Sequence, residues 1–204
     1  LKTSVTSAAL IKDKSLVDET DAKEESAIIT VGTENDSGEI VSNLSSAEKG
    51  TIAHRILEHY DFALGDIKTQ VENMIKSGVL TKKEADSVSV DRLERAINTH
   101  IFSVVNGKTL YREVPFFANF SAKDALCVNA PENVLIQGII DLLAVDGKDA
   151  IIIDYKYSRL DKDKLKEKYQ KQLCLYEKAV SSVLGLNVIK KYLFNIYSGE
   201  VVEL

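Results

Sequence analysis

Cysteine is scarce in this chain of 204 residues, and the two that occur, Cys127 and Cys174, stand apart without CxxC spacing. We therefore expect reduced thiols in the core or at the surface, and no four-cysteine iron–sulfur cluster. Long hydrophobic runs are also missing: no apolar stretch approaches the roughly 20 residues of a membrane span, and no signal peptide is recognisable. These absences predict a cytoplasmic protein without membrane contact.

Internal repeats and low-complexity tracts are absent too, and at 45% apolar residues the chain is long enough for one domain with a sizeable core. The net charge of −5 arises in residues 1–49, which hold five lysines and ten acidic residues. Residues 1–43, rich in Ser, Thr, Asp and Glu, indicate an acidic linker or peripheral arm, or a lone helix or strand packed on a neighbour. We expect residues 44–204 to form the domain. Because Leu1 is not an initiator methionine, we expect a longer parent polypeptide.

Hydrophobic periodicity and capping residues predict an alternation of helices and strands in residues 44–204. An amphipathic helix begins at the capping box of Ser45 with Glu48 and has apolar residues up to position 64. A second capping box, Thr81 with Glu84, opens another helix. That helix is predicted to span 81–105, and two others span 67–77 and 160–184. The predicted strands span 109–118, 133–145, 149–156, 188–197 and 200–203.

Two acidic side chains interrupt hydrophobic strands, Asp141 in 133–145 and Asp154 in 149–156. The turn residues 146–148, with glycine in the middle, predict that these strands are antiparallel neighbours. An acidic residue among Ile and Leu is unfavourable unless something compensates its charge, and a divalent cation is the usual compensation where two such residues converge. The pair therefore predicts a metal site.

Side chains alternate along a strand, so Ile152, Asp154 and Lys156 share one face. Asp154 is then placed to bind a metal, and Lys156 to orient or deprotonate an attacking water. Asp141 supplies a second oxygen ligand of the kind that magnesium and manganese prefer. Such an ion lowers the pKa of a bound water and stabilises charge on a phosphate. The alternative is an edge strand whose polar side chains simply face water.

The helix that begins at Ser45 carries a candidate ligand, His54. On a helical wheel His54 lies beside Leu57 at the margin of the apolar stripe, where it faces the sheet. Gly50 is unfavourable inside a helix and suggests close approach of another backbone or of a ligand. The alternative for His54 is a surface or packing role, the same role that we expect for the other two histidines, His59 and His100.

The helix predicted at 160–184 places Gln172 and Tyr176 on one face, because they are four residues apart. Between Lys156 and Lys171 the chain holds seven Lys or Arg residues against three acids. Such a surplus beside a metal site attracts a polyanion. The alternative is a solvated helix face of mixed charge.

Taken in order, these motifs resemble those of the RecB-type nuclease domains of the PD-(D/E)XK superfamily, over roughly residues 44–200. The branch most alike is the C-terminal nuclease domain of AddA-type helicase-nucleases, which act in bacterial double-strand-break repair. The resemblance implies a restriction-endonuclease-like α/β fold with a central mixed sheet flanked by helices. It rests on Gly50-x-x-x-His54-x-x-x-Glu58, Glu113-Val114-Pro115-Phe116, Gly138-x-x-Asp141, Asp154-Tyr155-Lys156 and Gln172-x-x-x-Tyr176.

The resemblance also implies roles for individual residues. Lys156 corresponds to the catalytic lysine, and Glu113 to a polar position of less certain role. The proline of the superfamily's name is replaced by Ile140, as is usual in this branch. The implied metal ligands are His54, Asp141, Asp154 and the carbonyl of Tyr155, and the residues implied to border the site and the DNA path are Gln172 and Tyr176.

We therefore expect a magnesium- or manganese-dependent DNA exonuclease that yields a 5′-phosphate and a 3′-hydroxyl. The resemblance implies that its partners are a helicase part of the same polypeptide and an AddB-like subunit. It also implies that the substrate is single-stranded or end-processed double-stranded DNA. Two alternatives remain open. One is a nuclease-like module that binds nucleic acid or a partner protein without cutting, and the other is a metal-dependent hydrolase of small phosphate esters.

Overall fold

The computed structural model of the protein describes residues 44–121, 123 and 133–204. The predicted linker or arm at 1–43 and Cys127 lie outside the described residues. Cys174 is an exposed free thiol, one of the two environments that we expected. No helix in the described part of the chain is long and apolar enough to cross a membrane.

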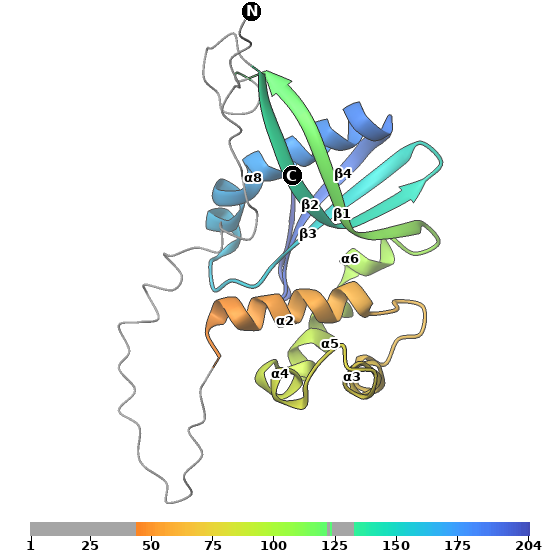
Figure 1. The fold of residues 1–204 in the computed structure, drawn as a ribbon, viewed down its shortest axis with the longest axis vertical. Helices are drawn as coiled ribbons and strands as arrows, with labels where there is room; N and C mark the ends of the chain where they lie inside the picture. Colours follow the sequence, from red (N-terminus) through yellow and green to blue (C-terminus); the bar gives the residue numbers. More distant parts are fainter. Residues whose placement is uncertain (1–43, 122, 124–132) are drawn as a thin grey trace, which may run out of the picture.

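The described residues form a mixed five-stranded sheet flanked by helices, as predicted (Figure 1). The strand order is β1-β2-β3-β4-β5, with β3 and β4 parallel and every other neighbouring pair antiparallel. The strands are β1 (Thr109–Ser121), β2 (Asn133–Asp146), β3 (Asp149–Lys156), β4 (Asn187–Asn195) and β5 (Val201–Glu203). The helices are α2 (Ser46–His59), α3 (Ile67–Lys76), α4 (Lys82–Ser87), α5 (Val90–Ile97), α6 (His100–Ser103) and α8 (Lys162–Ala179), which a π-helical turn, η2 (Val180–Leu184), continues.

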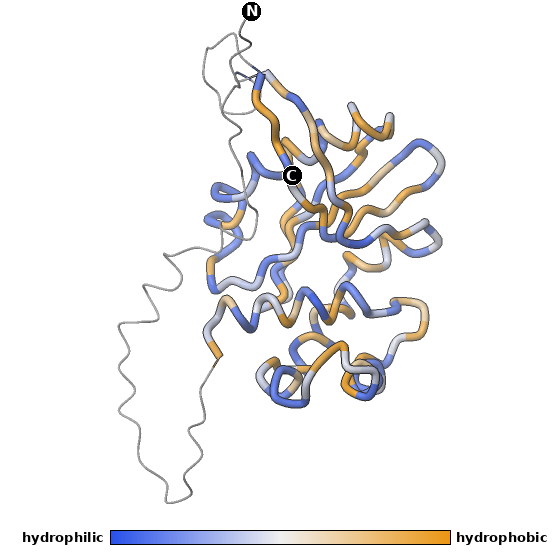
Figure 2. Tube along the Cα trace, viewed as in Figure 1, coloured by the Kyte–Doolittle hydropathy of each residue, from blue (hydrophilic) through white to orange (hydrophobic). Residues whose placement is uncertain are grey.

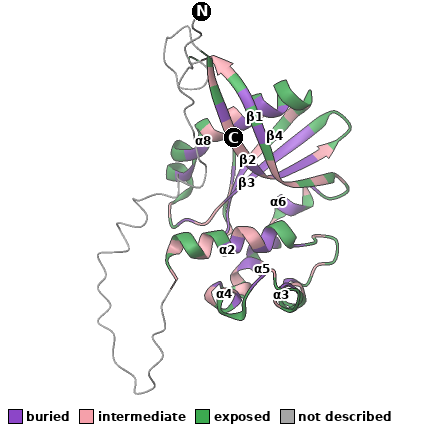
Figure 3. Ribbon diagram, viewed as in Figure 1, coloured by how far each residue is buried: buried purple, intermediate pink, exposed green. Residues whose placement is uncertain are grey.

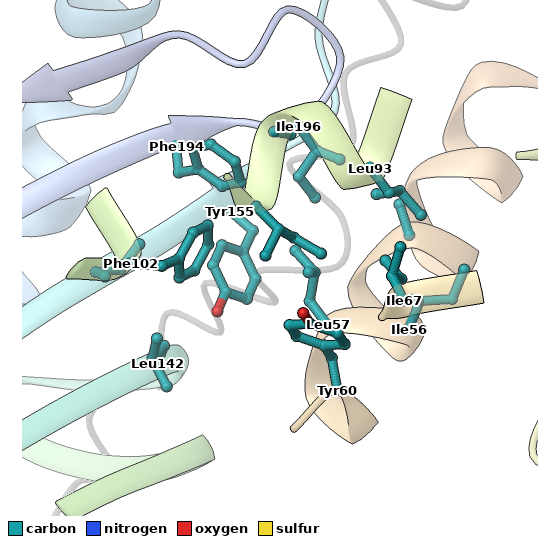
Figure 4. Packing of buried hydrophobic residues seen from close by; sticks show 14 of the residues in the cluster. Ile56, Leu57, Tyr60, Ile67, Leu93, Phe102, Leu142, Tyr155, Phe194 and Ile196 are labelled. Atoms are coloured by element: carbon teal, nitrogen blue, oxygen red, sulfur yellow. The ribbon is translucent and has the colours of Figure 1, made fainter. Parts of the chain in front are cut away.

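Helices cover both faces of the sheet, and β3, in the middle of the sheet, is its most buried strand (Figure 3). Residues of α2, α3, α4, α5 and α6 form one core cluster with β2, β3 and β4, and α8 with η2 forms further clusters on the other face. Figure 4 shows the first cluster, in which Leu57 and Tyr60 lie near Tyr155 of β3 and Phe194 of β4. In this three-layer arrangement α2 packs on one face of the sheet and α8 packs on the opposite face.

Helix α2 begins at the predicted capping box, since the Ser45 and Glu48 side chains each accept a hydrogen bond from the other residue's backbone N–H. Hydrophilic and hydrophobic residues alternate along it (Figure 2). Each fully buried Ile or Leu on its inner face contributes about 1.5–3 kcal/mol. The buried residues of this face are Ile52, Ala53, Ile56 and Leu57.

Two predicted helices were wrong in extent. The first ends at His59 rather than near position 64, because Tyr60 leaves the helical region (ψ 128°) to bury its ring, while Leu64 is 74% exposed. The helix predicted at 81–105 is three short helices. Ser89 and Thr99 adopt extended backbone and open α5 and α6, and the Ser89 hydroxyl accepts a hydrogen bond from a backbone N–H of α5. The extended backbone at these two residues, which a side-chain cap accompanies at Ser89, interrupts a hydrophobic pattern that otherwise looks continuous.

Candidate functional site

The site forms where β2 separates from β3. Their pairing runs from Asp146 and Asp149 to Leu142 and Ile153, so the next pair in the same register would be Asp141 and Asp154. Here a side chain of β2 takes the place of a backbone acceptor: Asp141 Oδ2 accepts a hydrogen bond from the Tyr155 N–H at 2.6 Å. The two acids predicted to converge are therefore at neighbouring positions on adjacent strands.

His54 reaches this point from α2, on the sheet-facing side that the helical wheel predicted. Its Nδ1 lies 3.6 Å from Asp141 Oδ1, and the two side chains are 29% and 11% exposed. The imidazole meets the Tyr155 ring edge-on at 5.8 Å between centroids. Asp141 thus uses one oxygen toward the β3 backbone and the other toward His54.

Glu113 completes the cluster from β1. The pairs Arg112 with Leu142 and Val114 with Ile140 leave Glu113 facing Asp141 across a break in the ladder. Its φ of 49° is left-handed, a conformation that costs a residue other than glycine about 1–3 kcal/mol and that concentrates at functional sites. One ligand atom each from His54, Glu113 and Asp141 lies within 4.8 Å of the others. The sequence assigned Glu113 only an uncertain role, because its strained backbone has no glycine to signal it.

Asp154 and Lys156 share one face of β3, as predicted, and form an ion pair. Asp154 is 1% exposed, and Lys156 Nζ lies 2.8 Å from its Oδ2. The same ammonium lies 4.6 Å from the ring centroid of Tyr169 on α8. Asp154 is not in the cluster of three ligand atoms that His54 belongs to, although its charge acts on that histidine.

Burial and neighbouring charges have opposite effects on the pKa values of His54 and Asp141. Burial and the Lys156 charge lower the pKa of His54, but the carboxylates of Asp141 and, less strongly, Asp154 outweigh them and hold this pKa above the ordinary 6.5. Burial likewise raises the pKa of Asp141, while His54, Lys156 and the Tyr155 N–H together bring it below its ordinary value. Asp141 is therefore ionised at neutral pH and available as a ligand.

Gln172 and Tyr176 lie on one face of α8, as expected, and Gln172 Nε2 donates to the Tyr176 hydroxyl at 2.6 Å. Tyr176 is buried, with its ring edge-on to Phe116 at 5.4 Å. Gly138 makes this contact possible, because a Cβ there would lie 2.7 Å from Phe116 Cε1 and 3.3 Å from Tyr176 Cε1. Tyr176 thus packs α8 onto the β1–β2 pair and holds the Gln172 amide in place.

Gly50 has a close neighbour, as its position inside a helix suggested, but this neighbour is a side chain. A Cβ at Gly50 would lie 3.3 Å from the Cβ of Tyr157, where we expected a backbone or a ligand. His59 and His100 are exposed on helices, one of the two placements that we expected for them.

One imidazole and two carboxylates converge in the cluster, and a third carboxylate, that of Asp154, lies on the adjoining strand directly before Tyr155. Carboxylate oxygens with a histidine nitrogen suit a divalent metal ion, and carboxylates are the ligands that magnesium and manganese prefer. The residues present therefore fit a divalent cation.

Curated relatives from several bacteria share one description, the A subunit of an ATP-dependent helicase/nuclease. The chain is 30% identical to that of Clostridium acetobutylicum over 81% of its own length and 14% of the relative's. It is 32% identical to that of Ruminiclostridium cellulolyticum, covering 79% of this chain and 14% of the relative. It is also 32% identical to that of Oceanobacillus iheyensis, covering 74% of this chain and 13% of the relative. The chain thus spans about one seventh of the length of the relatives that it matches.

The family comparison agrees with the fold and with the order of the motifs. Residues 33–203 match the model of the PD-(D/E)XK nuclease superfamily, a match that includes every residue of the cluster and of the Asp154–Lys156 pair. With a mixed sheet flanked by helices and carboxylates where its strands diverge, the chain belongs to the PD-(D/E)XK nuclease superfamily.

Proposed function

We propose that this chain is the nuclease domain of an AddA-type helicase-nuclease and cleaves DNA as a magnesium- or manganese-dependent exonuclease. The observation that carries the proposal is the convergence of His54, Glu113 and Asp141 within 4.8 Å, beside the ion pair of Asp154 with Lys156. The names of the relatives support the helicase context. Because the chain covers only 14% of those relatives, the proposed partners are the helicase part of the same polypeptide and an AddB-like subunit.

The proposed ligands are His54, Asp141, Asp154 and the carbonyl of Tyr155, with Glu113 added by its place in the cluster. A bound cation would activate a water and stabilise the charge that develops on the phosphate. Asp141 orients the His54 imidazole and is itself held by the Tyr155 N–H. Lys156, held between Asp154 and the Tyr169 ring, is placed to orient or deprotonate the attacking water. Gln172 positions the strand.

Cleavage of linear and circular single-stranded DNA tests this function. We expect the purified chain to degrade an end-labelled linear strand with magnesium or manganese, to leave the circular strand intact, and to be inactive in EDTA. An exonuclease needs an end, so cutting of the circle would refute the exonuclease assignment. Binding without cleavage in either metal would favour the non-cutting module. Hydrolysis of bis(p-nitrophenyl) phosphate without DNA cleavage would favour a small-ester hydrolase.

The lysines of α8 are proposed to attract the DNA backbone, but the helix divides them between two sides. An α-helix has 3.6 residues per turn, so the position of each lysine around α8 follows from its number. The buried stripe that faces the sheet separates the lysines on the side of Gln172 from the other lysines. Lys168, beside the Tyr169 ring, lies on the Gln172 side. By this period the Gln172 side also carries Lys164 and Lys171, and the opposite side carries Lys162 and Lys166.

This division allows a test with equal charge changes. Lys168→Glu with Lys171→Glu should weaken binding of single-stranded DNA and flatten its salt dependence by about 0.7 in log–log slope for each phosphate that is no longer neutralised. Lys162→Glu with Lys166→Glu is the matched control and should change the slope less. Titrations of a labelled oligonucleotide at several salt concentrations give both slopes. Equal slopes in the two variants would show that α8 does not guide the strand. Gln172→Ala should reduce cleavage without changing the slope, because an amide releases no counterions.

A further inference from the structure

A cavity of about 360 Å³ lies between α5 and the turn that follows β4, and it shares no residue with the metal cluster. Its volume is within the roughly 300–1,000 Å³ typical of ligand pockets. We call it the arginine cavity. It is lined by Arg92, Arg95, Ala96, Thr99, Tyr197, Ser198 and Gly199.

The charged groups that line the arginine cavity are the two guanidinium groups. Among the residues that the structure describes, no ion pair involves Arg92 or Arg95. The neighbouring acids of α5 share one ammonium, since Lys68 Nζ lies 2.9 Å from Asp91 and 3.2 Å from Glu94, and the charge of Arg95 also acts on Asp91. One further acid, Glu200, accepts a hydrogen bond from the lining residue Ser198. The lining itself carries two positive charges and no acidic residue, and positive charge in a concave site favours an anion.

Arg92 is held in a defined orientation. Its Cζ lies 4.2 Å from the ring centroid of Tyr197, and Arg159 approaches the same ring at 5.6 Å. A guanidinium stacked on an aromatic ring loses little further freedom on binding, and its planar donors match two oxygens of a phosphate. Tyr197 is therefore a positioning residue for Arg92.

The wall of the arginine cavity is tied to the strand that carries Asp154 and Lys156. The Lys156 carbonyl accepts a hydrogen bond from the Ile196 N–H at 2.7 Å, and Tyr157 meets the Tyr197 ring edge-on at 5.6 Å. Leu93, next to Arg92 on α5, packs with Ile196 in one buried cluster (Figure 4). These contacts set the cavity beside the end of β3, at a fixed position relative to the metal cluster.

Buried Asn195 reinforces this link. Its side-chain oxygen accepts hydrogen bonds from the N–H groups of Ser158 at 3.3 Å and of Tyr197 at 3.1 Å. Its amide nitrogen donates to the Ser158 carbonyl at 2.9 Å. The segment that follows Lys156 and the turn that carries Tyr197 therefore hold each other in place.

We propose that the arginine cavity binds a backbone phosphate of the same DNA strand whose scissile bond lies at the metal cluster. Arg92 and Arg95 bind the phosphate oxygens, and the ring of Tyr197 positions Arg92. The choice of DNA as the ligand rests on the proposed nuclease function. The cavity would anchor the strand a short distance from the point of cleavage, so that the scissile phosphate stays in register with Lys156.

The test is binding of a fluorescent oligothymidylate of about 20 nucleotides in EDTA, where no cleavage competes. We expect Arg95→Gln to weaken binding about tenfold, as for loss of a charge-assisted hydrogen bond, and to reduce the log–log salt slope by about 0.7. Lys148→Gln is the matched control. It removes the same charge from an exposed turn at the other end of β3, about 27 Å along the strand. Tyr197→Phe should bind like the wild type, and Tyr197→Ala more weakly, because only the ring is needed.

Equal binding by Arg95→Gln and Lys148→Gln, with both variants folded by urea titration, would overturn the proposal. A second result would also overturn it: an Arg95→Gln variant that loses binding to polyglutamate but keeps its affinity for the oligonucleotide. The arginine cavity would then bind an acidic protein segment rather than DNA. Cleavage is assayed separately. If binding depends on Arg95 but the wild type cuts no DNA with either metal, the nuclease proposal fails while the phosphate site stands.

Discussion

Asp154→Asn and Lys156→Gln are each expected to lower the rate of DNA cleavage by at least about 10²–10³-fold, the loss typical when a group that stabilises transition-state charge is removed. Asp154 is 1% exposed and paired with Lys156 at 2.8 Å, so both changes act at the centre of the proposed site. Cleavage is measured as initial rates on end-labelled linear DNA with magnesium and with manganese. Asp149→Asn, an exposed acid at the other end of the same strand, is the matched control and should keep normal activity.

The same pair determines what these variants do to stability. Removal of a buried carboxylate that nothing compensates is expected to stabilise a metal-free protein. The ion pair changes this expectation, because Asp154→Asn leaves Lys156, only 16% exposed, without its carboxylate. We now expect a loss of up to about 3 kcal/mol in the free energy of unfolding, partly restored in Asp154→Asn with Lys156→Met. If either single variant cleaved DNA at close to the wild-type rate, the residue substituted in it, Asp154 or Lys156, would not belong to the catalytic site.

Metal affinity is expected to fall steeply as the pH drops through the pKa of His54. A histidine ligand must be neutral, and although burial lowers this pKa, the Asp141 carboxylate holds it above 6.5. The loss of affinity should therefore begin at a higher pH than for a free imidazole. Calorimetric titration with manganese between pH 5.5 and 8.5 measures it. His54→Gln should weaken binding by at least about 10-fold, the lower end of the loss seen when a metal site is perturbed, and remove most of the pH dependence.

The metal-free protein should show the opposite trend in stability. Because the folded pKa of His54 is raised, its ion pair with Asp141 stabilises the fold below pH 6.5, and this contribution is lost as the pH rises through the folded pKa. The rise in melting temperature on adding manganese should therefore grow with pH. His59→Gln, an exposed histidine on the same helix, is the control and should behave as wild type. Equal manganese affinity in His54→Gln and His59→Gln would return His54 to a packing role.

Local rules were sufficient for most of the secondary structure. The capping boxes at Ser45 and Thr81 and the glycine turn at 146–148 mark element boundaries within a few residues, because each depends on neighbours in the chain. The period of two put Asp154 and Lys156 on one face, and the period of 3.6 paired Gln172 with Tyr176. Chemistry that depends on spacing within one element was therefore predictable.

Contacts between elements were not predictable in the same way. The sequence places Asp141 and Asp154 on adjacent strands, and the family motifs bring in His54, but which partner each side chain takes depends on where β2 leaves β3. That separation lets Asp141 bond the Tyr155 N–H, and it leaves Asp154 paired with Lys156. No local pattern specifies a register that is interrupted at one residue.

By itself, the sequence determined the order of helices and strands, the face of β3 that carries Asp154 and Lys156, and the family, because these follow from short-range periodicity and from motifs in a fixed order. The tertiary structure alone decided that Glu113, with its left-handed backbone, joins His54 and Asp141, and that Arg92 of α5 stacks on Tyr197 beyond β4. The physical reason is that these residues meet through packing of elements far apart in the chain. Their proximity depends on how the whole core is filled, and no local propensity encodes it.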